Sequence, residues 1–307
     1  MINIIDPLSL IITQIIAYST IYALASLGMV LCGRAGIFNI SGEGVMATSA
    51  SVAFAVVVIS QNLVMGTLAA IIVGGIYGLS FIILHEKFKV NQFIVGICFI
   101  IAGTALGDLI FKIIITEYVV IPQIKAVSII NIPLLSQIPL VGGLFRQSIF
   151  TYSTYVLIIA LWFFTYKTRK GLEYRAVGEN PKGADVVGVS VTGTRVIATV
   201  LAGVLMGLGG AYLPLVVTGS YSIGMVAGRG FMAIGIAIFA NWKPQRIFVS
   251  ALIFAAFEVL ATNLQVYVIR QNIYLVQALP FIAVLLIMVF GKQARWPSWL
   301  GEPYDRE

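Results

Sequence analysis

Long apolar stretches alternate with short polar connections along the whole chain. Crossing the roughly 30 Å hydrocarbon core of a bilayer takes about 20 apolar residues in a helix. The pattern predicts nine such segments: Ser9–Cys32, Val45–Ser60, Leu63–Leu84, Phe93–Ile115, Phe150–Tyr166, Val196–Val217, Phe231–Asn241, Ile247–Leu264 and Tyr274–Phe290. Phe231–Asn241 is too short to cross unaided and is expected to be half of a broken span. We therefore expect an all-α polytopic membrane protein with about 8–9 transmembrane helices, as one domain over residues 1–307.

The composition supports a membrane protein. Hydrophobic residues make up 60% of the chain and charged residues only 10%, whereas a soluble domain carries about 25% charged residues. The first apolar stretch, Ser9–Cys32, is longer than the core of a signal peptide and has no basic residue before it, so we expect it to be retained as a helix.

The basic residues indicate an orientation, because loops that stay in the cytoplasm retain Lys and Arg. Fourteen of the nineteen fall in alternate connections or the C-terminal tail, 291–307: Arg34, Lys87, Lys89, Lys167, Arg169, Lys170, Arg175, Lys182, Arg195, Lys243, Arg246, Lys292, Arg295 and Arg306. This distribution predicts an N-terminus outside and a C-terminus in the cytoplasm. The net charge of +7 does not indicate nucleic acid, since these residues form no single basic face; membrane lipid is the expected surrounding.

Two glycine-rich stretches interrupt the helical pattern, at residues 33–44 and 218–230. Irregular backbone at membrane depth occurs where protein or a water-filled cavity satisfies its polar groups. Broken segments at corresponding places in two halves indicate a pathway between internal repeats. The hypothesis is an inverted repeat, and two ordinary glycine-rich loops are the alternative. Candidate pathway residues, which are also possible helix-packing positions, are Phe38, Asn39, Glu43, Ser220, Tyr221 and Ser222.

We single out four charged side chains within the predicted spans or breaks. Asp108 and Lys112 are four residues apart, so they share a helix face and can form an ion pair. Glu258 has no charged residue three or four positions away, so it faces a helix interface or polar cavity, or serves as a proton relay. Glu43 needs backbone N–H groups or Arg34 nearby to remain ionised.

The sequence offers no chemistry of catalysis or metal binding. It contains no phosphate-binding G-x-x-x-x-G-K-[ST] loop, and its two cysteines, Cys32 and Cys98, lack the C-x-x-C spacing. The single histidine, His85, lies at a helix end beside charged residues and is expected to be solvated. We expect neither an enzyme nor a bound cofactor or metal in this chain.

The longest basic connection, residues 167–195, contains a short amphipathic helix. Asn180 and Pro181 form a cap and a first helical residue, and Gly188 ends the helix that runs through Val187. A helix of this length is not stable alone. We therefore expect it to dock on a partner.

This connection resembles the cytoplasmic coupling loop of the permease subunits of ATP-binding-cassette importers for simple sugars, nucleosides and branched-chain amino acids. The similar positions are Gly171-Leu172-x-Tyr174-Arg175-Ala176-Val177-Gly178-Glu179-Asn180-Pro181-x-x-Ala184-x-x-x-Gly188-Val189. Gly33-Arg34-Ala35-Gly36-Ile37-Phe38-Asn39-Ile40-x-Gly42-Glu43-Gly44 is similar to the family's broken-helix motif, and Gly228-Arg229-Gly230-Phe231-x-Ala233 to its later G-[RK]-G-F-x-A segment. The N-I-x-x-E-G form resembles the smaller permease of nucleoside importers that use a basic-membrane-protein-type binding lipoprotein.

The resemblance implies a cell-membrane subunit that forms half of a pore. A second related permease would form the other half, a lipoprotein would deliver substrate from outside, and a separate ATPase would bind ATP and Mg²⁺. The expected ATPase-coupling residues are Glu179, Asn180, Pro181, Lys182, Ala184, Asp185 and Gly188, with Glu179 and Asn180 capping the short helix. The alternatives are a ribose-like sugar as substrate, a proton-coupled secondary transporter that uses Glu258 and Asp108, and a membrane scaffold or receptor without transport.

Overall fold

A computed structural model describes residues 7–116, 122–133, 135–138, 141–267, 278–282, 285, 289 and 296–304. The long helices in this part of the chain are α1 (Pro7–Arg34), α2 (Gly42–Ser60), α3 (Leu63–Glu86), α4 (Gln92–Ile115), α5 (Ile149–Lys167), α8 (Val191–Tyr212) and α10 (Pro244–Tyr267). Shorter helices are α6 (Arg169–Glu179), α7 (Pro181–Val186) and α9 (Arg229–Phe239). Seven helices in the described ranges are long and apolar enough to cross a membrane, which confirms the all-α polytopic class.

The helix bounds agree with most predicted spans. α8 begins five residues before the predicted Val196–Val217 and gives way to a π-helical turn, η3 (Leu213–Thr218), whose proline removes one backbone donor. α9 occupies the short segment predicted at Phe231–Asn241 and has 11 residues, too few to cross the membrane. The predicted span Tyr274–Phe290 lies largely outside the described residues, and of the tail 291–307 the structure describes 296–304.

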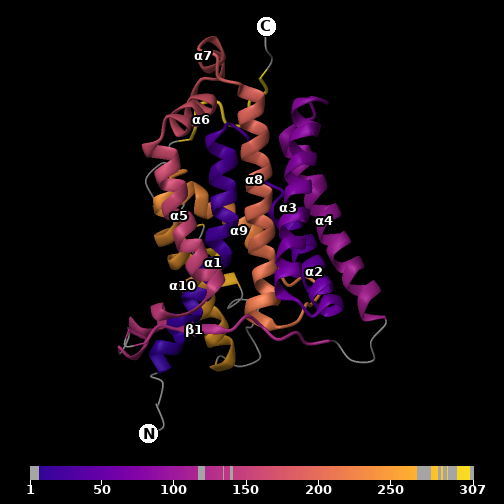
Figure 1. The fold of residues 1–307 in the computed structure, drawn as a ribbon, viewed down its shortest axis with the longest axis vertical. Coiled ribbons are helices and arrows are strands. Elements are labelled where there is room, and N and C mark those ends of the chain that lie inside the picture. Colours follow the sequence, from indigo (N-terminus) through magenta and orange to yellow (C-terminus); the bar gives the residue numbers. More distant parts are fainter. Residues whose placement is uncertain are drawn as a thin grey trace.

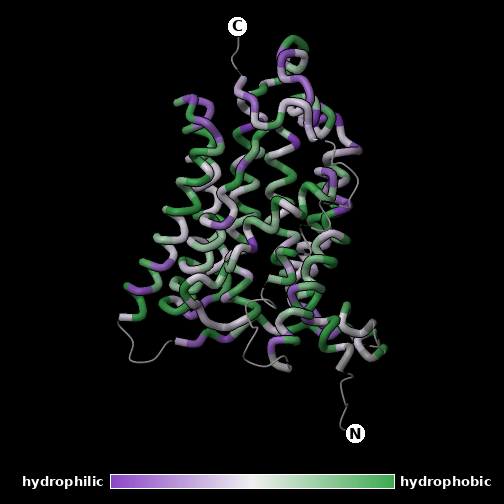
Figure 2. Tube along the Cα trace, turned by 180° about the vertical axis from the view of Figure 1, so that it is seen from behind, coloured by the Kyte–Doolittle hydropathy of each residue, from purple (hydrophilic) through white to green (hydrophobic). Residues whose placement is uncertain are grey.

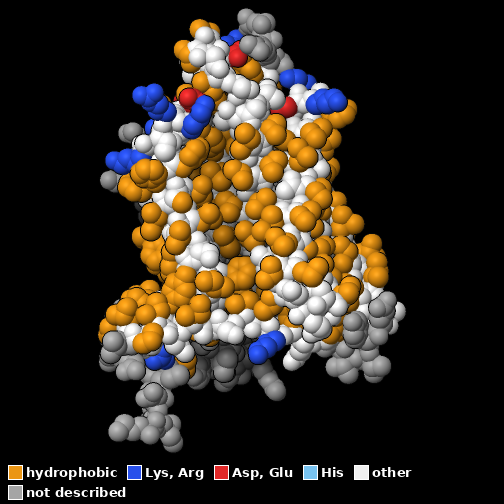
Figure 3. All heavy atoms as spheres, viewed as in Figure 1, with side chains coloured by type: hydrophobic (Ala, Val, Ile, Leu, Met, Phe, Trp, Pro, Cys, Tyr) orange, Lys and Arg blue, Asp and Glu red, His pale blue; other side chains and the backbone are white. Residues whose placement is uncertain are grey.

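The two ends of the bundle differ in their surface. In Figure 1 α1 begins at one end of the bundle, and α6 and α7 lie at the other. Lys and Arg side chains gather at the α7 end, while apolar side chains cover the side of the bundle between the ends (Figure 3). Figure 2 shows polar residues concentrated towards the two ends of the bundle and apolar residues between them. We call the end that carries α7 the basic end.

The centre of the bundle is made by α1, α2 and α8. In the most apolar window of α1 and of α2, 83% of residues are buried, against 28% in α3 and 22% in α4. α3 packs closely along α8: a Cβ added to Gly74 would lie 2.2 Å from the carbonyl oxygen of Gly203. Small residues at such crossings let membrane helices approach closely, and the exposed apolar faces of α3 and α4 suit lipid.

A small irregular layer lies at the end opposite α7. β1 (Ile129–Asn131) pairs antiparallel with β2 (Arg146–Ser148), and the short turns η1 (Leu135–Gln137) and η2 (Val141–Phe145) connect them. The side chain of Gln147 is buried and donates to the carbonyl oxygens of Gly143, 2.8 Å away, and Thr13, 3.2 Å away. These bonds join the layer to the beginning of α1.

Candidate functional site

The first break returns the chain from the end of α1 into the bundle. Gly36 has a φ of +87°, which favours glycine. Asn39 is 1% exposed, and its Oδ1 accepts hydrogen bonds from the backbone N–H (3.0 Å) and the hydroxyl (2.6 Å) of Ser41. The backbone N–H of Phe38 donates to Gln92 Oε1 at 2.6 Å, and the Phe38 ring packs against Trp242. In this conformation Asn39 shapes the turn, and Phe38 is half-buried at the basic end.

The second break lies between η3 and α9. Tyr221 is 2% exposed, packs against Phe54 and Phe111, and donates its hydroxyl hydrogen to Asp108 Oδ1 at 3.2 Å. Ser220 is half-buried and Ser222 is exposed. Of these three expected pathway residues, Tyr221 is therefore a packing residue in this conformation, and Ser222 is accessible.

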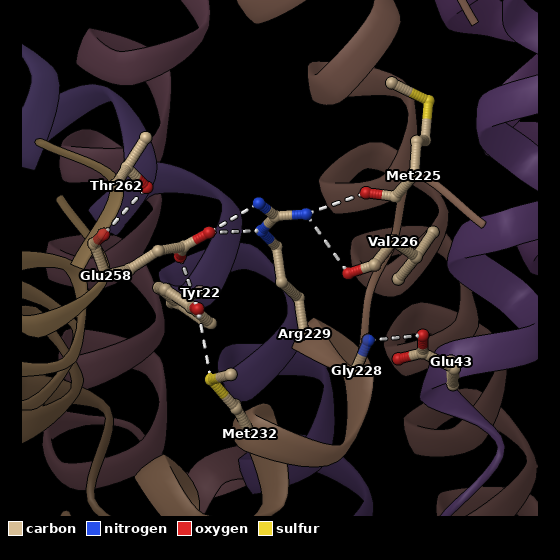
Figure 4. A network of polar contacts seen from close by, with 9 residues as sticks. All are labelled: Tyr22, Glu43, Met225, Val226, Gly228, Arg229, Met232, Glu258 and Thr262. Carbon is tan, nitrogen blue, oxygen red and sulfur yellow. Dashed lines mark hydrogen bonds and ion pairs between the residues drawn. The ribbon is translucent and has the colours of Figure 1, made fainter. Parts of the chain in front are cut away.

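The two breaks meet at Glu43. Its Oε1 accepts a hydrogen bond from Gly228 N at 2.8 Å (Figure 4). Its Oε2 accepts one from Gly230 N, also at 2.8 Å, where α9 begins. A Cβ added to Gly230 would lie 2.3 Å from the backbone nitrogen of Glu43, so the two backbones are in direct contact. Free N–H groups and the helix dipole favour a carboxylate at a helix N-terminus. Backbone N–H groups and Arg34 were the two expected neighbours of Glu43. The structure places the backbone N–H groups beside its carboxylate and Arg34 beside Glu179.

Glu258 is not isolated within the bundle, because α9 supplies its counter-ion. Arg229 Nε lies 3.0 Å from Glu258 Oε1, and Tyr22 donates to Glu258 Oε2 at 2.5 Å (Figure 4). Arg229 Nη1 also donates to the carbonyl oxygens of Met225, 2.7 Å away, and Val226, 3.2 Å away. The side chains of Arg229 and Glu258 are only 13% and 12% exposed. The carboxylate is thus neutralised from an element 29 residues away.

The expected ion pair between Asp108 and Lys112 is wrong. Asp108 accepts from Tyr221 of the second break, Lys112 is exposed, and the described residues show no ion pair between them. Spacing on a helix allows such a pair but does not by itself bring the two side chains together.

His85 is buried rather than solvated, with 4% of its surface exposed. Its Nδ1 lies 3.0 Å from the carbonyl oxygen of Val90, and its Nε2 lies 3.0 Å from Gln92 Nε2. The turn between α3 and α4 folds over the ring, which the apolar pattern did not indicate. Because Gln92 also binds Phe38, this turn supports the first break.

The connection 167–195 contains the short helix that the sequence predicts. Asn180 caps α7 by accepting from Gly183 N at 3.0 Å, Pro181 is the first helical residue, and Gly188 has a φ of +84°. The helix ends at Val186, one residue earlier than expected. Within it, Ala184 is buried and Lys182 exposed, while Asp185 accepts a hydrogen bond from Tyr304 of the tail at 2.9 Å.

α6 precedes α7 and attaches the loop to α1. Tyr174 is buried in α6 and its hydroxyl donates to the carbonyl oxygen of Leu31. Burial raises the pKa of Tyr174 well above its ordinary value, so the hydroxyl stays protonated as a donor. The α6 helix was not expected from the sequence, because its residues lack a long apolar face.

Glu179 does not cap α7, contrary to expectation. Its Oε1 lies 3.4 Å from Arg34 Nη1, and its Oε2 accepts from the backbone N–H (3.2 Å) and the hydroxyl (2.9 Å) of Ser298. Asn180 alone supplies the side-chain cap. Glu179 therefore faces α1 and the C-terminal tail.

Arg34, Arg229, Tyr22 and Ser298 belong to these contacts but not to the expected site residues. One signal was present for Arg229. Arg229 is a cation in the second break, Glu258 is a carboxylate in mid-span, and neither has a charged partner on its own helix. Two such residues at membrane depth are candidates for an ion pair with each other. Nothing in the local pattern indicated Tyr22 or Ser298. Among the described residues, no group of three His, Cys, Asp or Glu side chains is placed to hold a metal ion.

Residues 11–288 match the family of permease components of branched-chain amino acid transport systems. The chain belongs to this permease family. It is 32% identical to the nucleoside ABC transporter permease protein NupC of Lactococcus lactis, over 84% of each chain. It is 30% identical to the guanosine ABC transporter permease protein NupQ of Bacillus subtilis over 98% of each chain, and 32% identical to the putative glucose ABC transporter permease protein TsgC13 of Haloferax volcanii over 80% of this chain and 75% of that one. No solved structure matches the permease.

Proposed function

We propose that this permease is one of two transmembrane subunits of an ATP-driven importer of nucleosides, and that α7 docks on a separate ATPase. The observation that carries the proposal is the form of α7. It is a helix of six residues at the basic end, with Val186 88% exposed and Val187 76% exposed. A helix this short depends on packing, and Ala184 supplies only its inner face. The two exposed valines are left for a partner, and their burial would stabilise that contact.

The relatives support the substrate and the partner. NupC is named for nucleosides and NupQ for guanosine. A second permease of each organism, NupB of Lactococcus lactis and NupP of Bacillus subtilis, also matches the chain. Two related permeases of the same named specificity favour a pore built from two different subunits, of which this chain is one. Because TsgC13 is named for glucose, a simple sugar is the second candidate substrate.

The remaining parts follow from this assignment. The basic end is the cytoplasmic end, so the N-terminus lies outside. The ATPase binds ATP and Mg²⁺, and a binding lipoprotein delivers substrate from outside. Closure of the ATPase moves α7 and its attached spans as rigid bodies.

A proton-coupled secondary transporter is disfavoured by the contacts of the two carboxylates that it would use. Glu258 is bonded by Arg229 and Tyr22, and Asp108 by Tyr221. In this conformation side chains from other elements of the bundle contact both carboxylates, an arrangement that suits structural groups better than an open relay.

The test uses the complete transporter in proteoliposomes, with both Val186 and Val187 replaced by Asp. We expect co-purification of the ATPase and ATP-driven nucleoside uptake to fall about tenfold or more, because two apolar side chains lose their buried contacts. Leu172→Asp, at an exposed apolar position on α6, is the matched control and should keep both. Uptake that persists without ATP and follows a proton gradient would contradict the proposal, and uptake of glucose in place of nucleosides would select the second substrate.

A further inference from the structure

Arg34, the last residue of α1, joins three other elements at the basic end. Its Nε donates to the carbonyl oxygen of Trp242 at 2.7 Å, and its Nη2 lies 3.4 Å from both the carbonyl oxygen of Asn241 and the hydroxyl of Tyr166. Its Nη1 lies 3.4 Å from Glu179. The side chain is only 13% exposed. One guanidinium therefore contacts the ends of α5, α6 and α9.

The contact with α9 falls on a strained turn. Asn241 and Trp242 follow the helix and both have a φ of +54°, which is rare for a residue as bulky as Trp. Such conformations persist where the surroundings hold them. Here Trp242 is fully buried, and a Cβ added to Gly33 would lie 2.1 Å from its ring. The C-terminal end of α9 is thus fixed to the end of α1.

The contact with α6 is equally close. A Cβ added to Gly178 would lie 2.1 Å from the carbonyl oxygen of Arg34. The tail closes over the junction, since Trp299 N donates to the carbonyl oxygen of Gly178 and Gly301 N to that of Gly36, both at 3.0 Å. α7 begins two residues after Glu179. A displacement of α7 is therefore applied directly to the residues that surround Arg34.

The other end of α9 is held by the charged contacts described above. Glu43 binds the N–H groups of Gly228 and Gly230, and Arg229 pairs with Glu258. The first break thus provides a cation at the C-terminal end of α9 and a carboxylate at its N-terminal end. A helix of 11 residues is about 16 Å long and moves as a unit.

We propose that Arg34 is a positioning residue that passes the displacement of α7 to α9, and through α9 to the place where the two breaks meet. This inference rests on the proposed docking of α7 to an ATPase. A guanidinium suits the task because its five donors have fixed directions, so it holds Glu179 and two carbonyl oxygens together. The ammonium of a lysine is a point charge on a flexible stem, so it cannot fix the positions of Glu179 and the two carbonyl oxygens at the same time.

The test compares Arg34→Lys, Glu179→Gln and the double variant in the complete transporter. Assembly with the ATPase, the rate of ATP hydrolysis and the amount of nucleoside taken up per ATP are measured separately. We expect both single variants to assemble and hydrolyse ATP, with uptake per ATP reduced about fivefold or more. The double variant should be no worse than Arg34→Lys, because both changes break the same link. Lys170→Gln, which breaks an exposed pair with Glu173 on α6, is the matched control.

Unchanged uptake per ATP in Glu179→Gln would overturn the proposal. So would a double variant whose loss equals the product of the two single losses. If Arg34→Lys does not fold, Glu179→Gln decides alone, because it leaves the bonds from Arg34 to the carbonyl oxygens in place. Failure of the α7 docking itself is distinguishable, since it appears as unchanged ATPase co-purification when Val186 and Val187 are replaced.

Discussion

Both carboxylate oxygens of Glu258 are engaged, one by Arg229 and the other by Tyr22. At this depth each charge would be costly alone, and the pair is favourable because the remaining guanidinium hydrogens find the carbonyl oxygens of Met225 and Val226. The pair also ties α10 to the first turn of α9. It therefore fixes the second break from the side opposite Glu43.

Removal of one member of this pair should cost more stability than replacement of both. Glu258→Gln leaves the Arg229 charge buried without a counter-ion, a loss of about 3–5 kcal/mol, whereas Arg229→Leu combined with Glu258→Met removes both charges and should cost less. Thermal unfolding of the purified protein in detergent measures the difference. Glu173→Gln, in an exposed pair, is the control and should change stability by under about 1 kcal/mol. A double variant less stable than Glu258→Gln would contradict this account.

At the scale of elements, helix positions follow from the sequence better than helix contacts do. The predicted Leu63–Leu84 and Phe93–Ile115 lie within α3 and α4 and differ from them by two residues or fewer at either end, because apolar length is a local property. The crossing of α3 with α8 is not local, since Gly74 meets a residue more than 100 positions later. A glycine in an apolar stretch gives no sign of which helix it faces.

The glycines at this crossing make a second prediction. Gly74→Ala places a Cβ 2.2 Å from a backbone oxygen of α8, a clash that the backbone must move to relieve, at a cost of about 1–3 kcal/mol. Gly75→Ala, one residue further on the same helix, meets only a methyl group of Val204 at 3.6 Å and should be tolerated. The yield of monodisperse protein and its unfolding temperature distinguish the two. Equal losses in both variants would show that helix propensity or lipid contact, rather than the crossing, is responsible.

For the whole molecule, the alternation of basic residues indicated the orientation, but it did not separate loop charges from buried ones. Arg195 is fully buried and pairs with Glu86 at 3.0 Å, and Arg34 is nearly so. Arg229 lies inside the bundle. These residues make contacts inside the fold rather than in solvated loops, and the candidate site was predictable only where the signal was local, as in the cap of α7. The lysines at the α7 end still carry the asymmetry, because Lys170 and Lys182 are exposed there.

The orientation is testable with single cysteines. The background replaces the natural Cys32 and Cys98 with Ala, and Asn131→Cys in exposed β1 then reports on the end opposite α7. Lys170→Cys, at a side chain 79% exposed on α6, reports on the basic end. In right-side-out vesicles a membrane-impermeant maleimide should label Asn131→Cys at once and Lys170→Cys only after the membrane is opened, because retained lysines mark the cytoplasmic side. The reverse order would place α7 outside, where no ATP-driven partner is available, and would remove the basis for coupling through Arg34.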